Sequence, residues 1–436
     1  MKNEEFAAAV PCPKIEIRAC KSLRGRIVLP ASKSISNRAL LINALSGNAV
    51  LPDNLSDSDD TQVMLAALKA VGEERVLDIG AAGTAMRFLT AYLSVTPGEH
   101  VITGTERMKH RPISILVDAL RQLGAEIAYE GEEGFPPLRI VGHDSLEGGS
   151  LTVPGNVSSQ YVSALLMIAP TLKKGLRLTL TGRIASRPYL DMTISMMHDF
   201  GAKAEWQGDN VIEVQPGPYL QRDYTIESDW SAASYWYEIV ALSKDANAVV
   251  DLVGLHHDSI QGDSKVWRLM SELGVVTEYY EEPDGTEVIR LRKNGNLTCY
   301  FSQDFTHQPD LAQTFAATCT MLDIPFRLVG LQSLRIKETD RIAALVEELG
   351  KIVSIDGTDS ELLWDGSYSI DDVELMPYET LTFDTYDDHR MAMALAPVCL
   401  RTGGSVVIKH PEVVSKSYPA YWDDLKKVGF WIWRGQ

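Results

Sequence analysis

The sequence predicts an α/β protein of two similar domains, and three observations support this prediction. The chain has 436 residues, 45% hydrophobic and 23% charged, which is typical of a globular protein with more than one domain. Six segments end in the same amphipathic helical pattern, which closes on a glycine. Six further helical stretches are apolar on almost every face.

Apolar residues one and four positions before a glycine mark the first set of helices. Val71 and Leu68 precede Gly72 in this way. The same spacing recurs before Gly124, Gly201, Gly274, Gly350 and Gly429. Such residues share one helix face, and glycine most easily adopts the left-handed conformation that ends a helix. Runs rich in β-branched and aromatic residues follow five of these glycines and predict strands at 126–131, 203–208, 275–282, 351–357 and 430–435.

The second set of helices is rich in small residues and has little polar surface, as expected of buried helices. It comprises 34–47, 83–94, 158–170, 231–242, 310–322 and 388–398. Six units, each with a buried and an amphipathic helix linked by strands, predict two domains of three units with parallel strand pairs. We expect the chain to cross between the domains near 30–33 and again near 227–230.

Charge and composition exclude several classes of protein. A formal net charge of −18 argues against nucleic acid or an anionic membrane surface as a partner. No apolar run reaches the roughly 18 to 20 residues of a membrane helix, and segment 1–14 is not typical of a secretory signal. The five cysteines form no CxxC pair, which favours reduced thiols and a cytoplasmic protein.

Polar residues stand at the starts of the buried helices, where packing alone does not require them. They are Lys33, Ser34, Gly83, Thr84, Ser158, Ser159, Gln160, Asp310, Asp388, His389 and Arg390. Capping explains any single one of them. Their recurrence, with basic residues in nearby loops, favours a site for a multiply charged anion, because helix N-termini and guanidinium groups bind phosphate and carboxylate.

Seven ordered motifs carry a resemblance to a known family. They are PASKSISNRAL (30–40), GAAGTAMR (80–87), RMKHRPI (107–113), VSSQYVSALLM (157–167), SRPYLDMT (186–193), LRIKETDRI (334–342) and YDDHRMAMALA (386–396). With these motifs the chain resembles the 3-phosphoshikimate 1-carboxyvinyltransferase, or EPSP synthase, family over nearly its whole length. The resemblance implies an inside-out α/β barrel fold in which each domain has three βαββαβ units. It places the ligand site in the cleft between domain 33–228 and a second domain of 1–32 plus 229–436.

The resemblance also implies an activity. The enzyme would transfer the carboxyvinyl group of phosphoenolpyruvate to the 5-hydroxyl of shikimate 3-phosphate and release phosphate, by addition and elimination through a tetrahedral intermediate. This reaction belongs to the shikimate pathway of chorismate and aromatic amino acid biosynthesis. The family likeness further implies a cytoplasmic monomer without cofactor or metal, inhibited by glyphosate in the phosphoenolpyruvate pocket.

Site residues follow from the motif positions. Those implied for phosphoenolpyruvate are Lys33, Gly83, Arg111, Gln160, Arg341, Arg390 and Lys416. Those implied for shikimate 3-phosphate are Lys33, Ser34, Arg38, Ser158, Ser159, Gln160, Ser186, Tyr189, Asp310 and Lys337. Asp310 would act as general base on the attacking hydroxyl, and Glu338 would protonate the methylene carbon, with Lys33 as a third catalytic group. Glu338 can do so only if its pKa is raised or its proton is shared.

Three positions depart from the family pattern. Ala81 replaces an asparagine whose amide would meet phosphoenolpyruvate. Phe88 replaces a proline, and we expect it to alter the helix that begins at Gly83. Ser333 stands where an asparagine would contact the shikimate ring.

Other functions fit the sequence less well. UDP-N-acetylglucosamine carboxyvinyltransferase shares the fold and the donor, but it typically has an AKNA-type segment and a loop cysteine, and 107–113 contains none. A non-catalytic protein that binds phosphorylated metabolites would not need Lys33, Asp310, Glu338 and Lys416 together, because binding alone requires no proton-transfer groups. A P-loop enzyme is excluded by the absence of GxxxxGK[ST], and His256 and His257 lack the spacing of a metal site.

Overall fold

The computed structural model describes residues 13–144, 146–367 and 380–435. Both predicted sets of helices are present. The buried helices are α1 (Lys33–Ser46), α3 (Gly83–Ser94), α5 (Ser159–Ile168), α7 (Trp230–Leu242), α9 (Ala312–Met321) and α11 (His389–Leu395). The amphipathic helices are α2 (Asp59–Ala70), α4 (Ser114–Gln122), α6 (Arg187–Asp199), α8 (Val266–Met270), α10 (Arg341–Leu349) and α12 (Tyr421–Lys427). Every residue of α9 and α11 is buried, as their compositions predict.

The glycines that follow the amphipathic helices adopt the expected conformation in five cases. Gly72, Gly124, Gly201, Gly274 and Gly429 all have φ between 81° and 101°. The prediction is wrong for Gly350, whose φ of −59° is right-handed. Strands follow these helices as expected, except that 351–357 forms only the two-residue β16 (Asp356–Gly357). Ile352, Val353 and Ile355 are instead buried in the core, where they serve packing rather than a ladder.

The strands form five four-stranded sheets among the described residues. The strand order is β3 (Val76–Asp78), β4 (Gly98–Thr103), β6 (Leu138–Gly142), β5 (Glu126–Tyr129) in the first sheet and β7 (Gly149–Pro154), β8 (Leu176–Thr181), β10 (Val211–Val214), β9 (Ala204–Trp206) in the second. It is β2 (Arg24–Val28), β11 (Val249–Val253), β13 (Glu287–Leu297), β12 (Leu273–Glu281) in the third sheet and β14 (Phe301–Asp304), β15 (Phe326–Val329), β17 (Glu361–Trp364), β16 in the fourth. In the fifth sheet the order is β18 (Leu381–Phe383), β19 (Ser405–Lys409), β1 (Lys14–Arg18), β20 (Trp431–Gly435).

All five sheets repeat one pattern. The first two strands of each order are parallel, and the remaining pairs are antiparallel. In four of the sheets a single buried helix lies between the parallel strands, because parallel neighbours need a long crossover. The exception is the β2–β11 pair, whose strands are separated by residues 29–248. In three of the sheets the chain runs strand, buried helix, strand, amphipathic helix, strand, strand without interruption. In the other two sheets one strand, β2 or β1, comes from the N-terminal segment. The α1–α2 pair lacks such a sheet and has only the bridges Ala31–Ser228 and Asp53–Thr225.

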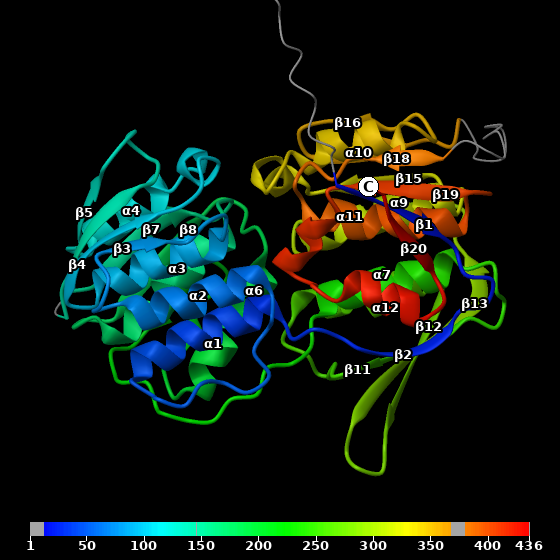
Figure 1. The fold of residues 1–436 in the computed structure, drawn as a ribbon. Coiled ribbons are helices and arrows are strands. Elements are labelled where there is room, and N and C mark those ends of the chain that lie inside the picture. Colours follow the sequence, from blue (N-terminus) through cyan, green and yellow to red (C-terminus); the bar gives the residue numbers. More distant parts are fainter. Residues whose placement is uncertain (1–12, 145, 368–379, 436) are drawn as a thin grey trace, which may run out of the picture.

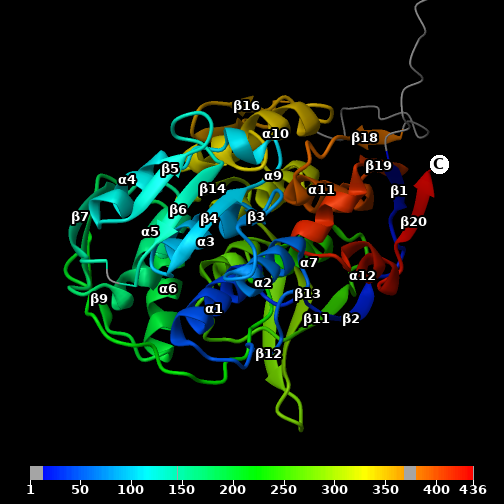
Figure 2. The same ribbon diagram turned by 60° about the vertical axis from the view of Figure 1, so that its left-hand side comes forward.

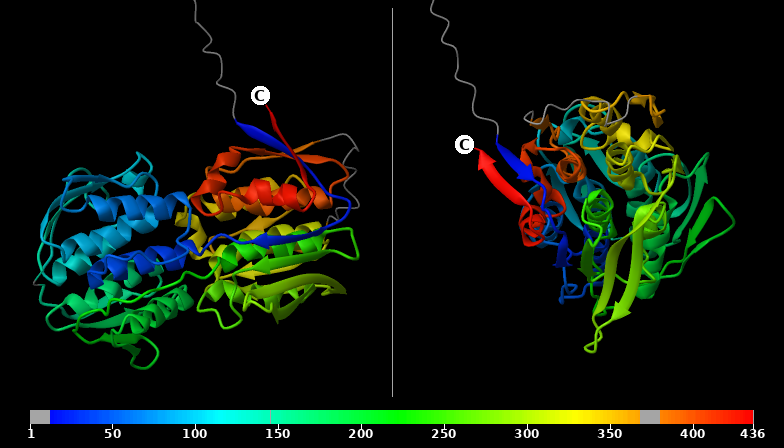
Figure 3. Two further views of the ribbon diagram at one scale, coloured as in Figure 1. Left: turned by 60° about the horizontal axis from the view of Figure 1, so that its bottom comes forward. Right: turned by 90° about the vertical axis from the view of Figure 1, so that its right-hand side faces the viewer.

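The buried hydrophobic side chains form two separate clusters. One extends from Ala31 to Ile226, and the other combines Ile15 to Leu29 with Trp230 to Phe430. We call the parts of the chain around them the first and second lobes. Figure 1 shows the lobes side by side, with helices running together inside each and sheets on the outer faces. The left panel of Figure 3 shows the same arrangement with the bottom turned forward.

The chain passes between the lobes twice, and the two passages pair with each other. The amide of Ser32 donates to the carbonyl of Glu227 at 2.8 Å, and that of Asp229 donates to the carbonyl of Pro30 at 2.9 Å. β1 and β2 thereby join sheets of the second lobe, β1 between β19 and β20 and β2 beside β11. The fold is thus α/β with two lobes of repeated units, as predicted.

None of the helices in the described part of the chain is long and apolar enough to cross a membrane. Cys20, Cys299, Cys319 and Cys399 are free thiols, and Cys12 lies outside the described residues.

Candidate active site

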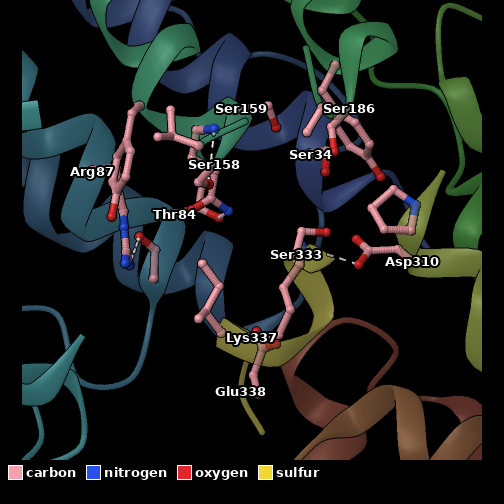
Figure 4. Close-up of a pocket in the computed structure, with 18 of the residues that line it drawn as sticks. Ser34, Thr84, Arg87, Ser158, Ser159, Ser186, Asp310, Ser333, Lys337 and Glu338 are labelled. Carbon is pink, nitrogen blue, oxygen red and sulfur yellow. Dashed lines mark hydrogen bonds and ion pairs between the residues drawn. The ribbon is translucent and has the colours of Figure 1, made fainter. Parts of the chain in front are cut away.

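A pocket of about 1320 Å³, counting the space open to solvent, lies between the two lobes. The first lobe contributes the starts of α1, α3 and α5, and the second contributes the segments that begin α9, α10 and α11. Figure 2 shows the helices of both lobes with the first lobe turned forward, and Figure 4 shows side chains from both lobes facing one space. Helix starts carry unpaired N–H groups and partial positive charge, so the space suits an anion.

Nearly all the site residues predicted from the sequence line this pocket. They are Lys33, Ser34, Arg38, Gly83, Arg111, Ser158, Ser159, Gln160, Ser186, Tyr189, Asp310, Lys337, Glu338, Arg341 and Arg390. Ser333, the departure from the family asparagine, lines it too. Lys416 is the exception: it is not among the lining residues, and its ammonium donates to the carbonyl of Asp387 at 2.9 Å.

Serines at the helix starts combine capping with a position in the pocket. Ser158 Oγ accepts from the Gln160 amide at 3.3 Å and so caps α5, while its hydroxyl proton stays available to a ligand. The Gln160 side-chain amide donates to Thr84 Oγ1 at 3.0 Å, which links the starts of α5 and α3. Capping and anion binding are therefore compatible readings of the same residues.

Ser186 occupies an unusual backbone conformation just before α6. Its φ is 54°, a left-handed value that non-glycine residues adopt at a cost of about 1 to 3 kcal/mol. Its amide donates to the carbonyl of Thr306 in the second lobe at 2.9 Å. This strained residue therefore holds a serine hydroxyl at the pocket and joins the lobes.

The second lobe places a buried network of opposite charges at the pocket. Arg341, only 1% exposed, donates to Asp388 at 2.7 Å, to Asp310 at 2.9 Å and to Glu338 at 2.9 Å. Arg390 donates to the other oxygen of Asp310 at 3.0 Å. Two guanidinium groups thus bracket the Asp310 carboxylate and fix its orientation.

The charges around Asp310 and Glu338 determine their ionisation. Burial alone would raise the pKa of Asp310, but Arg390, Lys337 and Arg341 together hold it well below its usual range. Burial likewise opposes the charge on Glu338, but Arg341 and other nearby cations hold its pKa well below normal. Both carboxylates are therefore ionised before any ligand binds, and the raised pKa that an acid role for Glu338 requires is absent in the free pocket.

The first lobe supplies cations of a different kind. Arg38 and Arg87 are 3% and 5% exposed, and within the described residues neither has a carboxylate at ion-pair distance. Burial lowers the pKa of each to about 10. Both remain charged at neutral pH, so they present uncompensated positive charge to the pocket.

Asp60 and Arg87 are pocket residues that the sequence reasoning missed. Asp60 lies 3.6 Å from the ammonium of Lys33, and burial raises its pKa, with Lys33 opposing the rise. Its acidic neighbourhood, SDSDD, is typical of a solvated helix start, so no sequence signal separated it from its neighbours. Arg87 could have been identified from the sequence, because a charged residue inside an otherwise apolar helix is unusual and indicates a polar partner or ligand.

The departures from the family pattern have distinct outcomes. Ala81 is exposed and does not line the pocket. Helix α3 begins at Gly83 and continues unbroken through Phe88, whose side chain is fully buried. Gly83 and Thr84 both line the pocket at the start of that helix.

In the described part of the chain, no cluster of three or more His, Cys, Asp and Glu side chains has an arrangement that could hold a metal ion. His256 and His257 lie exposed and pair with Glu287 and Asp258.

The protein has two lobes of repeated α/β units with a cation-lined pocket between them, and this combination defines its structural class. The structure resembles that of EPSP synthase from Acinetobacter baumannii, with a TM-score of 0.75 at 22% identity over 97% of this chain and all of that one. This likeness concerns the fold.

Sequence relatives are closer. The chain is 56% identical over 423 residues to a 3-phosphoshikimate 1-carboxyvinyltransferase of Bacteroides fragilis, covering 96% of this chain and 99% of that protein. It is 34% identical to one from Sulfurovum, covering 95% and 99%. The family model for EPSP synthase (3-phosphoshikimate 1-carboxyvinyltransferase) matches residues 17–75 and 70–425. The chain belongs to the EPSP synthase family.

Proposed function

We propose that the protein transfers the carboxyvinyl group of phosphoenolpyruvate to the 5-hydroxyl of shikimate 3-phosphate and releases phosphate, as a cytoplasmic enzyme of the shikimate pathway. One observation carries this proposal above the others. Cations from both lobes, among them Lys33, Arg111 and Arg341, surround the carboxylates Asp310 and Glu338 in one pocket. Two anionic substrates need such cations, and proton transfer during addition needs the carboxylates.

Phosphoenolpyruvate would bind where the cations of the two lobes meet. Its ligands would be Lys33, Gly83, Arg111, Gln160, Arg341 and Arg390, with Lys416 turning in from the Asp387 carbonyl. Gly83 and Arg111 support this placement by their contact, since a Cβ on Gly83 would lie only 2.5 Å from the Arg111 guanidinium. The glycine keeps that guanidinium close to the positive end of α3, where a phosphate would gain from both.

Shikimate 3-phosphate would lie against the first lobe. Ser158, Ser159 and Ser186 would hold its phosphate, at the starts of α5 and α6. Ser34, Arg38, Tyr189, Asp310 and Lys337 would contact its ring and carboxylate. The uncompensated charge of Arg38 supports this assignment, because a buried cation without a carboxylate partner is stabilised when an anion arrives.

The chemistry would proceed by addition and elimination. Asp310, ionised and held by Arg341 and Arg390, would accept the proton of the 5-hydroxyl as its oxygen attacks C2 of phosphoenolpyruvate. C3 would gain a proton from Glu338 or Lys33, forming the tetrahedral intermediate. That intermediate would then lose phosphate and the C3 proton. Substrate anions pair with the cations that depress the pKa of Glu338, so binding itself raises this pKa and makes an acid role possible.

The two parts of the pocket would belong to two domains, 33–228 and 1–32 plus 229–436, although 1–12 and 368–379 lie outside the described residues. Support comes from the two separate hydrophobic clusters and from the paired passages between them. A ligand that touches both lobes would draw them together and exclude water.

The test is phosphate release by the purified protein with both substrates in EDTA. We expect release that depends on shikimate 3-phosphate, and we expect Asp310→Asn and Glu338→Gln each to lower kcat at least 100-fold, the scale of general acid–base catalysis. Glu347→Gln, on the exposed face of α10, is the matched control. Absence of release would refute the function. UDP-N-acetylglucosamine in place of shikimate 3-phosphate tests the related activity in the same assay.

The enzyme would act as a monomer. Glyphosate would compete with phosphoenolpyruvate in the same pocket. Gly83 supports the binding of glyphosate, because the missing Cβ lets the Arg111 guanidinium lie at the start of α3, where it could bind a phosphonate as it would a phosphate. We expect the apparent KM for phosphoenolpyruvate to rise with glyphosate concentration. Millimolar glyphosate that leaves the rate unchanged at low phosphoenolpyruvate would refute the proposal.

A further inference from the structure

Arg38 is a buried cation whose hydrogen-bond partners among the described residues are all neutral. Its Nε donates to Thr193 Oγ1 at 2.8 Å, its Nη1 to the carbonyl of Ser34 at 2.9 Å and its Nη2 to Ser163 Oγ at 3.1 Å. Taking a charge out of water without an opposite charge is costly. Some other feature of the surroundings must therefore stabilise the guanidinium.

Two aromatic rings provide that feature. The guanidinium carbon of Arg38 lies 5.4 Å from the ring centroid of Phe88 and 6.0 Å from that of Tyr189. Aromatic faces carry partial negative charge and attract cations most strongly away from water. Phe88 comes from α3, Tyr189 from α6 and Arg38 from α1, so three helices meet at this contact.

We propose that Phe88 is a positioning residue for the bound shikimate 3-phosphate, acting through Arg38. Its ring stabilises and orients the guanidinium as a carboxylate would, but it does not neutralise the charge. The charge therefore remains available to the substrate anion. This inference rests on the proposed function, since it takes Arg38 as a ligand of shikimate 3-phosphate.

Core packing is the alternative explanation, because Phe88 is fully buried among the hydrophobic residues of the first lobe. The two explanations differ in what an aliphatic residue would do. Leucine fills a similar space and would satisfy packing, but it offers no π face to the cation.

The experiment compares Phe88→Leu with Phe88→Tyr, which retains a ring, and with Phe200→Leu. Phe200 is an equally buried phenylalanine in the same hydrophobic cluster. Like Phe88 it does not line the pocket, but among the described residues no cation lies over its ring, whereas Arg38 lies over that of Phe88. We expect Phe88→Leu to raise the KM for shikimate 3-phosphate about tenfold, the scale of a desolvated cation–π contact, while kcat and the KM for phosphoenolpyruvate change less than about twofold. Phe88→Tyr should restore most of the affinity, and Phe200→Leu should leave both KM values unchanged.

An unchanged KM for shikimate 3-phosphate in Phe88→Leu, or an equal rise in Phe200→Leu, would overturn the inference. If Phe88→Leu does not fold, Phe88→Met makes the same comparison. Calorimetric titration with shikimate 3-phosphate separates this inference from the proposed function. Wild-type protein that binds this ligand without turnover would refute the function alone, and the ratio of dissociation constants between the Phe88 and Phe200 variants would still decide the inference.

Discussion

Arg341 connects the carboxylates of the pocket at the scale of single residues. Burial would lower the pKa of its guanidinium, but Asp388, Glu338 and Asp310 raise it, so the group stays charged at any working pH. Removing one member of such a buried group typically costs about 3 to 5 kcal/mol, because the others are left unpaired. The network therefore acts as a unit, and a substrate anion that pairs with Arg341 should raise the pKa of the carboxylates that share this guanidinium.

Gly83 gives a prediction at this scale. Gly83→Ala places a Cβ 2.5 Å from Nη1 of Arg111 and 3.0 Å from its Cζ, so the guanidinium must move. We expect the KM for phosphoenolpyruvate to rise about 10- to 100-fold, as for a lost charge-assisted hydrogen bond, with little change for shikimate 3-phosphate. Steady-state kinetics measure this, and Gly217→Ala, where a Cβ meets open space, is the control. Equal KM values in both variants would show that Arg111 does not bind phosphoenolpyruvate.

The N-terminal ends of several helices supply the residues that line the pocket. The buried helices pack inside their lobes, so their N-termini reach the pocket together with whatever side chains stand there. Helix α10 is an amphipathic helix that adds Arg341 in its first turn, and Asp340 caps it by accepting from the amide of Ala343 at 3.1 Å. The capping residue therefore supports both the helix and the position of Arg341.

Asp340→Ala is predicted to weaken both helix α10 and the positioning of Arg341. Loss of the cap should lower the free energy of unfolding by about 1 kcal/mol. The substitution also removes the 2.6 Å ion pair between Asp340 and Arg335, and kcat should fall because Arg341 is less well held. Urea denaturation and steady-state kinetics measure the two effects. Asp340→Ser keeps a capping oxygen, and equal stability losses in both variants would contradict the capping argument.

Asp263 links elements of both lobes and gives a pH prediction. It lies in the 3-10 helix η3 (Gly262–Lys265), accepts from Ser231 of α7 and lies 3.4 Å from the Tyr189 hydroxyl of α6. Burial, with Asp310 and Asp229 nearby and Arg390 opposing, raises its pKa to about 6. An unfolded aspartate has a pKa of about 3.9, so the folded state holds the proton more tightly and its stability falls as pH rises from about 4 to about 6.

Asp263→Asn should remove this loss. We expect the stability of the variant relative to wild type to increase by about 2 kcal/mol between pH 4.5 and pH 7. Urea denaturation at both pH values measures it, and taking the difference cancels the other titrating groups. A difference that is independent of pH would show that Asp263 titrates normally.

Contacts between the lobes surround the pocket at the scale of the whole molecule. Arg183 pairs with Asp304 at 2.5 Å on one side, and Arg107 lies 3.9 Å from Asp387 on another. The second pair is 47% and 66% exposed, and such pairs contribute roughly 0 to 1 kcal/mol. We expect such exposed pairs to contribute little to closure of the lobes, and anions that bind cations of both lobes to contribute more.

Ligand-driven closure is therefore predicted. Adding shikimate 3-phosphate together with glyphosate should lower the radius of gyration measured by small-angle scattering, and neither ligand alone should do so fully. Arg341→Ala, which removes a cation of the second lobe, should weaken the response. Identical scattering with and without both ligands would contradict closure.

Much of the fold could be predicted because helical and strand periodicity are local. The spacing of Leu68 and Val71 before Gly72 predicts one face of a helix from only a few neighbouring residues. Its repetition along the chain predicts the repeated units. Gly350 shows the limit of such reasoning, because its neighbours alone do not set its φ. Most of the strand expected at 351–357 is likewise absent, because Ile352 and Val353 are buried in the core and do not pair in a sheet.

The sequence by itself determined the repeated units, the buried helices and, through its motifs, the residues that line the pocket. Only the tertiary structure decided which charges meet there. Asp60 enters the pocket beside Lys33, and Lys416 turns to the Asp387 carbonyl. The ionisation of Asp310 depends on Arg390 and Lys337. Periodicity acts over neighbouring residues, whereas burial and Coulomb interactions depend on distances that only packing sets.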